Sequence, residues 1–558
     1  MALHQPMPAA DADINKTTSG HISGNDQRVA ENVTRAWAKK SIDQTVFEAV
    51  LNAAKTYGAD KTVIEDSEKN TLTYKRLILA SLILGTKLTK GTKPGDAIGV
   101  LLPNVTGLIV TLLGLNAHGR VPALLNFTAG PRNVVSAIQT APTARVVTSR
   151  RFVEAASLQQ LIEAIKTTTL ADGRKVDIVY LEDVRKNIGP TAKVIGLLQS
   201  KIAKRFHRSR KAAPDKPAVI LFTSGTEGRP KGVVLSDRNL IGNANQIIAH
   251  ADGFLSDKDT VLNPLPMFHS FGLTAGTIMP LTQGMRVILY PSPLHYKQIP
   301  KLIRQKQANV LFATDTFLQG YARAADPDDL ASLRFVVAGA ERVKEATRAL
   351  WQKLGTEIQE GYGATECAPV IACNLPSINT PGSVGPFLPG VEHKLTPVPG
   401  IGDGGRLMVR GPNVMLGYLY ADNPGTLVPP KDGWHDTGDI IAIENNKVVI
   451  KGRAKRFAKI GGEMVSLAAI EELANSVWPE AQHVALSSPD PKKGEQLILV
   501  TDKQDAQKSE LQSEARKLGF PELWIPKTLK IVAAIPVLGT GKIDIPATAE
   551  LLESGQTS

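Results

Sequence analysis

A loop rich in glycine and hydroxyl residues is the segment best suited to chemistry. Residues 221–232 read LFTSGTEGRPKG and continue an apolar run. Glycines let the backbone approach a polyanion closely, and N–H groups and hydroxyls can donate to phosphate oxygens. The spacing differs from a Walker A loop, because the lysine is followed by Gly232 rather than by Ser or Thr. The sequence predicts a phosphate-binding loop that uses Thr223, Ser224, Gly225, Thr226, Gly228 and Lys231.

Five further segments combine glycine turns with aromatic, acidic or basic residues. They read PLPMFHSFG at 264–272, EGYGATE at 360–366, WHDTGD at 434–439, GRAKR at 452–456 and LGTGKID at 538–544. Together with the loop, and in the same order, they resemble the motifs of the adenylate-forming superfamily, which includes acyl-CoA synthetases, luciferases and nonribosomal adenylation domains. The resemblance implies an enzyme that joins a carboxylate to ATP, releases pyrophosphate and passes the acyl group from AMP to a thiol.

The resemblance also implies the nucleotide contacts. Tyr362, in the turn with Gly363, is expected to stack on adenine. Asp439 is expected to accept hydrogen bonds from the ribose hydroxyls and Arg453 to donate to them. Taken singly, these residues would also fit a core tyrosine, a helix N-cap and a solvated arginine. The segment VAGAE at 337–341 resembles the strand-end loop that lines the adenine and acyl pocket, which adds Gly339, Ala340 and Glu341.

Two lysines and one metal ligand are implied for catalysis. Lys542 is expected to reach the carboxylate and α-phosphate oxygens, and removing such a preorganised charge typically costs about 10²–10³ in rate. Glu366 is expected to hold Mg²⁺, which binds few carboxylates together with phosphates, and Thr365 to contact the α-phosphate. In the second step, rotation about the hinge residue Lys455 would bring Lys459 into the place of Lys542.

Two positions leave alternatives open. His269 resembles a residue that senses the substrate or the phosphate, and a core histidine is the alternative. Glu227 stands where the superfamily has Thr or another small residue, and we expect it to point away from the triphosphate or to reach Mg²⁺ through water. The segments SGTEG, 451–467 and 537–544 are similar to the synthetase half of bacterial 2-acylglycerophosphoethanolamine acyltransferase/acyl-carrier-protein synthetase. The acyltransferase activity of that family is not expected here.

The elements that must position these residues alternate between β-branched runs and helical patterns. Buried parallel strands are expected at 97–102, 145–148, 177–181, 218–223, 309–313 and 333–338. Their alternation with helices predicts an α/β fold, with a large N-terminal domain of mostly parallel sheets flanked by helices and a small mobile C-terminal α+β domain. The expected divisions are a disordered or loosely ordered tail over 1–40, a large adenylation domain over 41–452 and a small C-terminal lid domain over 453–558.

Composition excludes several classes of protein. Of the 558 residues, 42% are hydrophobic, which excludes a disordered chain, and two cysteines cannot form a disulfide scaffold. Two cysteines also fit a reducing compartment. The most apolar stretch, 107–115, falls short of the roughly 20 residues that span a bilayer, and it indicates a buried helix or strand. We therefore expect a cytoplasmic protein, with association to a membrane surface as an open alternative.

The net charge of +12 is concentrated in one segment. Residues 193–217 hold eight Lys or Arg against one Asp. The apolar residues beside these cations recur at helical spacing and predict a basic amphipathic helix: Ile195, Leu198, Ile202 and Phe206. An acidic acyl carrier protein or an anionic membrane would be attracted to it, and a solvated helix without a partner is the third alternative. Nucleic acid is not expected, because the segment lies within an enzyme.

The acid and the thiol decide the function. Abundant Leu, Val and Ala in 97–125 and 261–290, without a basic pair for a second carboxylate, favour an apolar acid. The leading prediction is ATP- and Mg²⁺-dependent activation of a medium- or long-chain fatty acid, followed by transfer to the phosphopantetheine thiol of acyl carrier protein. A fatty acyl-CoA synthetase is the first alternative. The other alternative is a non-catalytic, membrane-associated binding protein on a ligase fold. Peripheral membrane contact through 193–211 is compatible with catalysis as well.

Overall fold

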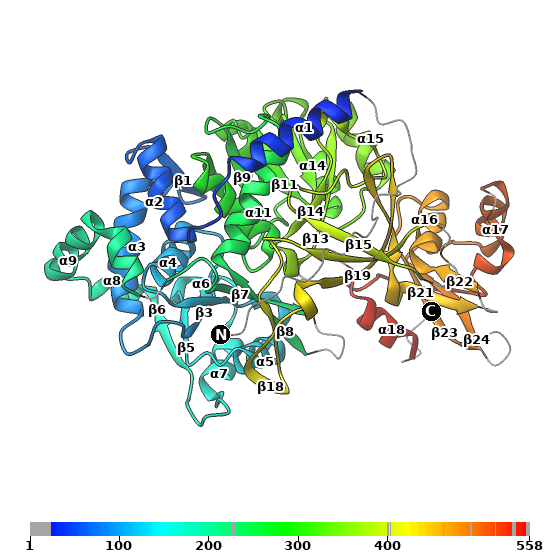
Figure 1. Ribbon diagram of the computed structural model, residues 1–558. Helices are drawn as coiled ribbons and strands as arrows, with labels where there is room; N and C mark the ends of the chain where they lie inside the picture. Colours follow the sequence, from blue (N-terminus) through cyan, green and yellow to red (C-terminus); the bar gives the residue numbers. More distant parts are fainter. Residues whose placement is uncertain are drawn as a thin grey trace, which may run out of the picture.

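Four sheets organise the chain into a large N-terminal domain and a smaller C-terminal one (Figure 1). The computed structural model describes residues 24–210, 212–224, 229–398, 401, 403–460, 463–490, 494–518, 520–537 and 543–553. Two eight-stranded sheets and a four-stranded sheet form the large domain, and a five-stranded sheet belongs to the small one. This is the α/β architecture that the sequence predicts.

The first eight-stranded sheet carries the predicted phosphate loop. Its strands, in spatial order, are β18 (Asn423–Val428), β17 (Gly417–Tyr420), β8 (Pro230–Ser236), β7 (Pro217–Ser224), β4 (Val121–Leu124), β3 (Ala97–Val100), β5 (Arg145–Thr148) and β6 (Asp177–Tyr180). The strands from β7 to β6 are parallel, whereas β7, β8, β17 and β18 pair antiparallel. The predicted loop therefore connects β7 to β8, where Thr223 lies opposite Lys231.

The second eight-stranded sheet supplies the other site motifs. Its strands are β14 (Val370–Cys373), β13 (Ile358–Gly363), β12 (Phe335–Ala338), β11 (Val310–Ala313), β9 (Thr260–Asn263), β10 (Arg286–Leu289), β1 (Thr62–Asp66) and β2 (Thr71–Thr73). The third sheet is antiparallel and contains β15 (Glu392–Thr396), β16 (Gly405–Arg410), β19 (His435–Glu444) and β20 (Lys447–Arg453). All the predicted strands are present, within three residues of the expected bounds, but β6 lies at the sheet edge and is only partly buried, so its predicted burial is wrong.

Helices cover both eight-stranded sheets. The principal ones are α2 (Val46–Tyr57), α3 (Tyr74–Leu88), α4 (Thr106–Ala117), α5 (Pro131–Thr140), α6 (Arg150–Ala155), α7 (Gln159–Thr167), α8 (Leu181–Lys186), α11 (Asp237–His250), η2 (Phe271–Ile278), α12 (Met279–Thr282), α13 (Gln298–Lys306), α14 (Asp315–Ala324) and α15 (Glu345–Lys353). None of the described helices combines the length and the apolar composition needed to cross a bilayer.

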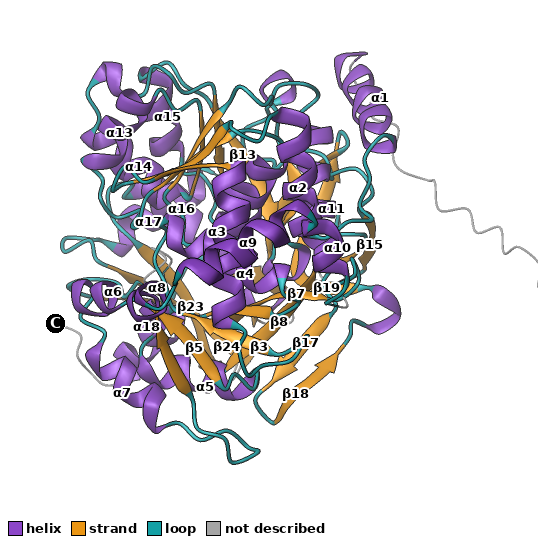
Figure 2. Ribbon diagram, turned by 90° about the vertical axis from the view of Figure 1, so that its left-hand side faces the viewer, coloured by secondary structure: helices purple, strands orange, loops and turns teal. Residues whose placement is uncertain are grey.

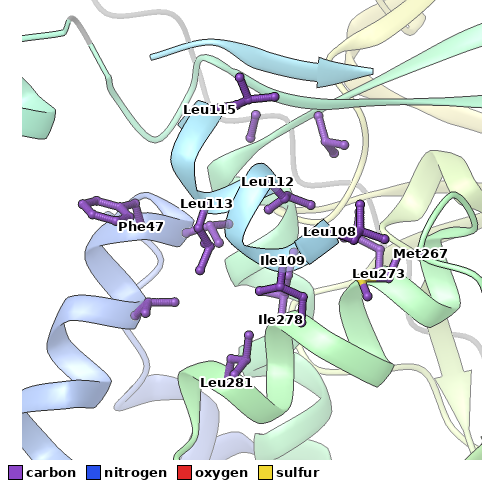
Figure 3. Close-up of a cluster of buried hydrophobic side chains, with 14 of the residues drawn as sticks. Phe47, Leu108, Ile109, Leu112, Leu113, Leu115, Met267, Leu273, Ile278 and Leu281 are labelled. Carbon is purple, nitrogen blue, oxygen red and sulfur yellow. The ribbon is translucent and has the colours of Figure 1, made fainter. Parts of the chain in front are cut away.

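Helix α4 lies in the largest apolar core, as Figure 3 shows. It contains no charged residue, and its aliphatic side chains are buried on all sides, as expected for an interior helix. Leu113 points toward Phe47 of α2, and Ile109 toward Ile278 (Figure 3). A small apolar cavity between α2, α4 and η2 is lined mainly by Val46, Ile109, Leu113, Met267, Leu273 and Ile278. The stretch 107–115, which the sequence left open between helix and strand, is a helix.

The predicted basic amphipathic helix is divided in two. Helix α9 (Pro190–Lys201) and helix α10 (Ala203–Arg208) meet at Ile202. Phe206 packs against the core, but Ile195, Leu198 and Ile202 are exposed. The expected single apolar stripe is therefore wrong, because Phe206 faces the core whereas the three aliphatic residues face outward.

Part of the predicted tail is ordered. Residues 24–38 form helix α1, which packs across α11, although the sequence predicts a loosely ordered segment over 1–40. Val29 and Val33 lie one helical turn apart and join a small apolar cluster with Leu375. Trp37 of the same helix lies against Gly390, so α1 contacts the large domain through a few apolar residues within a polar segment.

The small domain follows β20. Its sheet contains β22 (Glu463–Ser466), β21 (Phe457–Ile460), β24 (Gly494–Thr501), β23 (His483–Asp490) and β25 (Thr528–Ile531), with helices α16 (Leu467–Val477), α17 (Lys508–Lys517) and α18 (Ile545–Glu553). An ion pair joins the two domains: Arg342 Nη1, in the loop after β12, lies 2.5 Å from Glu472 Oε2 of α16. Both side chains are more than half exposed, at 62% and 54%.

Candidate active site

Lys231 stands on β8, directly after the predicted phosphate loop. Its Nζ lies 5.1 Å from the ring centre of Tyr418 and 5.6 Å from that of Tyr420. Both tyrosines belong to β17, the antiparallel neighbour of β8. Aromatic rings attract a cation without neutralising it, so Lys231 keeps its positive charge for an anionic ligand.

Tyr418 also connects this lysine to the predicted metal ligand. Its hydroxyl donates to Glu366 Oε1 at 2.7 Å, and the backbone N–H of Met415 donates to the carbonyl of Glu366 at 2.8 Å. Burial, together with the adjacent Glu366, raises the pKa of Tyr418, so the phenol remains a donor. Tyr418 thus contacts both Lys231 and the carboxylate of Glu366.

Thr365 lies next to the segment that contains His269. The hydroxyl of Ser270 donates to Thr365 Oγ1 at 3.5 Å. His269 is half-buried, and its ring centre lies 4.7 Å from that of Phe268. Two motifs almost a hundred residues apart in the sequence are thus adjacent in space.

The glycine before this motif is required by a close backbone contact. A Cβ on Gly363 would lie 2.2 Å from the carbonyl oxygen of Pro369. The N–H of Ala364 donates to the same oxygen at 3.0 Å, which closes the turn. Any larger residue at position 363 would displace the loop that presents Thr365 and Glu366.

Tyr362, Asp439 and Arg453 form a second connected group. The Tyr362 hydroxyl donates to Asp439 Oδ2 at 2.5 Å, and Arg453 Nε donates to Asp439 Oδ1 at 3.1 Å. Asp439 and Arg453 are direct partners on β19 and β20. Burial raises the pKa of Asp439 above its usual range and also raises that of Tyr362. A carboxylate offers about four acceptor positions, so Asp439 keeps capacity for further donors such as ribose hydroxyls.

The strand-end loop after β12 is fixed from two sides. Glu341 Oε2 accepts from the N–H and the hydroxyl of Thr316, at 3.0 and 2.9 Å. A Cβ on Gly339 would lie 3.0 Å from the ring of Phe271, two residues after His269. Ala340 has a left-handed φ of 69°. The loop is therefore held by the start of α14 and by the segment that contains His269.

Several predicted residues are not placed with the rest. Lys459 is exposed on β21, and its backbone N–H donates to Glu495 Oε2 at 2.5 Å. Lys455 belongs to the short helix η7 (Ala454–Arg456). The residues that lie outside the described part of the chain are Gly225, Thr226, Glu227, Gly228 and Lys542.

The structure adds residues that the motifs do not contain. Tyr418 and Tyr420 contact Lys231, and they alternate in the strand sequence GYLY, which by itself does not indicate the pairing of β17 with β8. Within the described residues, no group of three His, Cys, Asp or Glu side chains is placed to hold a metal ion by itself. One carboxylate beside a lysine fits Mg²⁺ bound mainly through nucleotide phosphates.

Known proteins share this architecture. Residues 50–419 match the family described as AMP-binding enzyme. The long-chain-fatty-acid–CoA ligase of Haemophilus influenzae is 25% identical over 545 residues, covering 91% of this chain and 95% of the ligase. A probable 4-coumarate–CoA ligase of Dictyostelium discoideum is 28% identical over 396 residues, covering 68% of this chain and 71% of that protein.

Solved structures agree with the predicted fold class. ATP-bound MatB from Rhodopseudomonas palustris, at 21% identity, superposes with a TM-score of 0.74 over 92% of this chain and 99% of MatB. The likeness confirms the α/β fold with a large N-terminal domain and a smaller C-terminal one. Since the family match spans well over half of the residues, the chain belongs to the AMP-binding enzyme family.

Proposed function

We propose that the protein activates a fatty acid with ATP to an acyl-AMP, releasing pyrophosphate, and then transfers the acyl group to the thiol of coenzyme A. The observation that carries this proposal is the contact of Lys231 with Tyr418 and of Tyr418 with Glu366. These two contacts connect the lysine at the end of the predicted phosphate loop to the predicted metal ligand. Two anions must meet in the first step, and the site supplies the positive charge that this requires.

Each described group has a role in this proposal. Lys231 neutralises phosphate charge, and Thr365 donates to the α-phosphate. Glu366 would hold Mg²⁺, which when bound screens the negative charge of the triphosphate. Asp439 accepts from the ribose hydroxyls while Tyr362 and Arg453 keep its carboxylate in place.

The apolar surroundings of one motif support a fatty acid as the substrate. Met267 precedes His269 by two residues, and Leu273 and Ile278 follow it on η2. All three line the cavity beside α4, which is surrounded by aliphatic side chains. The lining of this cavity is apolar except for Thr277 and Thr282, which supports an acid with an apolar chain.

Coenzyme A is the preferred acceptor because the fatty-acid ligases among the relatives are named for it. Acyl carrier protein, which the sequence alone favours, is the second candidate. The basic segment at 193–211 supports it, since acidic carrier proteins are attracted to cationic surfaces.

A comparison of acceptors tests the proposal. Thioester formation and pyrophosphate release are measured with ATP, Mg²⁺ and palmitate, together with either coenzyme A or holo-acyl carrier protein at equal concentration. We expect turnover with coenzyme A. If thioester forms only on the carrier protein, the proposed acceptor is wrong, but the proposed formation of acyl-AMP is still supported. No pyrophosphate release with any fatty acid from C8 to C18, with either acceptor, would support a non-catalytic binding protein instead.

The two lysines separate the half-reactions. Lys542→Ala should lower the rate of acyl-AMP formation by about 10²–10³ or more. The same variant should still transfer the acyl group of supplied acyl-AMP to the thiol at nearly the wild-type rate. Lys459→Ala should do the reverse. Equal loss of both half-reactions in either variant would contradict the exchange of the two lysines at one site.

A further inference from the structure

Helix α9 turns its apolar side away from the protein. The outward face, as we call it, consists of Val194, Ile195, Leu197, Leu198 and Ile202, whose exposed fractions are 55%, 47%, 51%, 59% and 54%. In the described part of the chain, eleven large hydrophobic side chains are exposed, and these five lie within nine residues. A surface helix of a globular protein normally buries such residues, and a contiguous exposed patch marks an interaction site.

Packing against α3 fixes this orientation. Gly196 is the buried residue of α9, and a Cβ there would lie 2.3 Å from Cγ1 of Ile83 on α3. Residues two positions apart on a helix point about 160° away from each other. Val194 and Leu198 therefore point almost directly away from the surface that Gly196 contacts.

The cations around the outward face are not balanced by acids. Residues 184–210 contain eight Lys or Arg and no Asp or Glu. Lys193, Lys201, Lys204 and Arg205 are exposed on α9 and α10. Arg208 is engaged elsewhere, because its Nε lies 2.5 Å from Glu48 Oε1. The patch thus combines an aliphatic centre with a positively charged border.

We propose that α9 and α10 form a docking surface for a membrane that contains anionic lipids. A helix that lies in the interfacial plane buries its aliphatic side among the acyl chains, while lysines and arginines contact the lipid phosphates. The aliphatic centre of the outward face and its positively charged border fit that arrangement. The proposal is independent of the acid and of the thiol acceptor.

The position of α9 favours a bilayer over an acyl carrier protein. In Figure 1, α9 lies at the end of the large domain farthest from the small domain. Figure 2 looks onto that end, with α9 and α3 near the centre of the view. A carrier protein bound there would have to deliver its thiol across the large domain. A membrane needs only an accessible end, and docking there leaves the small domain unobstructed.

Vesicle binding by the full chain tests the surface. Purified protein is sedimented with vesicles of phosphatidylcholine alone or with 30% phosphatidylglycerol, in 0.1 M and in 1 M NaCl. We expect binding to the anionic vesicles at 0.1 M salt and weaker binding at 1 M, where the screening length falls from about 10 Å to about 3 Å. The double variant Leu197→Ser/Leu198→Ser should bind about a hundredfold more weakly. The pair Lys201→Gln/Lys204→Gln should lose about thirtyfold, and only at low salt.

Matched controls exclude general effects of polarity and charge. Leu427→Ser/Val428→Ser removes two exposed aliphatic residues from β18, and Lys258→Gln/Lys353→Gln removes two exposed lysines elsewhere. Neither should change vesicle binding. Equal binding by all variants, or no binding by the wild type, would overturn the proposal.

Two other results would assign the surface to a different partner and would equally overturn it. One is a wild-type dimer in analytical ultracentrifugation that Leu197→Ser/Leu198→Ser converts to a monomer. The other is specific binding of an acidic carrier protein that the same variant abolishes, without binding to vesicles. Circular dichroism of each variant confirms that the chain is folded.

Discussion

The proposed nucleotide site and the outward face of α9 depart from the usual distribution of residues in opposite directions. In the site, Tyr362 and Asp439 are polar and yet only 8% and 5% exposed. On the outward face, Leu197 and Leu198 are aliphatic and more than half exposed. Buried polar groups and exposed apolar patches are both unfavourable without a compensating partner.

The two regions differ in where that compensation comes from. Tyr362, Asp439 and Arg453 satisfy one another inside the protein. The aliphatic residues of α9 have no such cover within the described part of the chain, and the proposed membrane contact would supply it. Departures from the normal pattern are expected at functional positions, and here they separate an internal site from an external surface.

The largest effect is expected in the site. Glu366→Gln removes the carboxylate charge beside Lys231 and should lower kcat/KM by about 10²–10³, as loss of a preorganised electrostatic group does. Steady-state kinetics with varied Mg²⁺ provide the measurement. Glu444→Gln, which removes an exposed carboxylate paired with Lys451, is the matched control. A loss of less than about fivefold would mean that Glu366 is not part of the reacting centre.

The next largest effect is expected from truncating a buried leucine. Compared with an exposed leucine of α9, it shows how far the loss of stability depends on burial. Leu115 of α4 is 0% exposed, and Leu115→Ala should lower the free energy of unfolding by about 2–5 kcal/mol. Urea denaturation followed by tryptophan fluorescence checks this. A loss below about 1 kcal/mol would show that the core around α4 repacks easily, and the contrast with α9 would then weaken.

The buried carboxylate should make nucleotide binding depend on pH. Burial raises the pKa of Asp439, so its protonated form becomes populated at a higher pH than for an ordinary aspartate. Protonation removes an acceptor, and the KM for ATP should therefore rise as the pH falls, beginning at a higher pH than an ordinary aspartate would cause. Asp439→Asn should show a KM about tenfold higher at neutral pH. Its KM should also vary less with pH, and an unchanged pH profile would contradict the role assigned to this carboxylate.

The smallest effect is expected on the outward face. Leu198→Ser should change the free energy of unfolding by no more than about 0.5 kcal/mol, because the side chain is already exposed. The same denaturation experiment serves, with Leu427→Ser as the comparison. A loss above about 1.5 kcal/mol would show that Leu198 is covered in solution, for example by a second copy of the chain.

The sequence predicts those features of the site that depend on neighbouring residues in the chain. The phosphate loop follows an apolar run that forms β7, and Thr365 and Glu366 follow a glycine turn, so each motif carried its own structural context. Tyr418 could not be predicted in the same way, because 52 residues separate it from Glu366. Its place in the site depends on the pairing of β17 with β8, which no local pattern indicates.

The side of α9 that faces the core could not be predicted from the sequence either. Periodicity predicts that aliphatic residues share one side of a helix, but not whether that side faces the core. Gly196 decides it, because a glycine permits close approach to α3 only on its own side. Helix α1 was overlooked for a related reason, since two valines in a polar segment do not produce a clear pattern.

The ion pair between Arg342 and Glu472 has a consequence for the timing of domain rotation. An exposed pair of this kind contributes less than about 1 kcal/mol, and salt screens it further. A reorientation of the small domain that separates the two residues would therefore meet little resistance at this contact. If the small domain rotates as proposed, the rate of exchange would be set by the backbone near β20 and by bound ligand, and the ion pair would act only to align the domains.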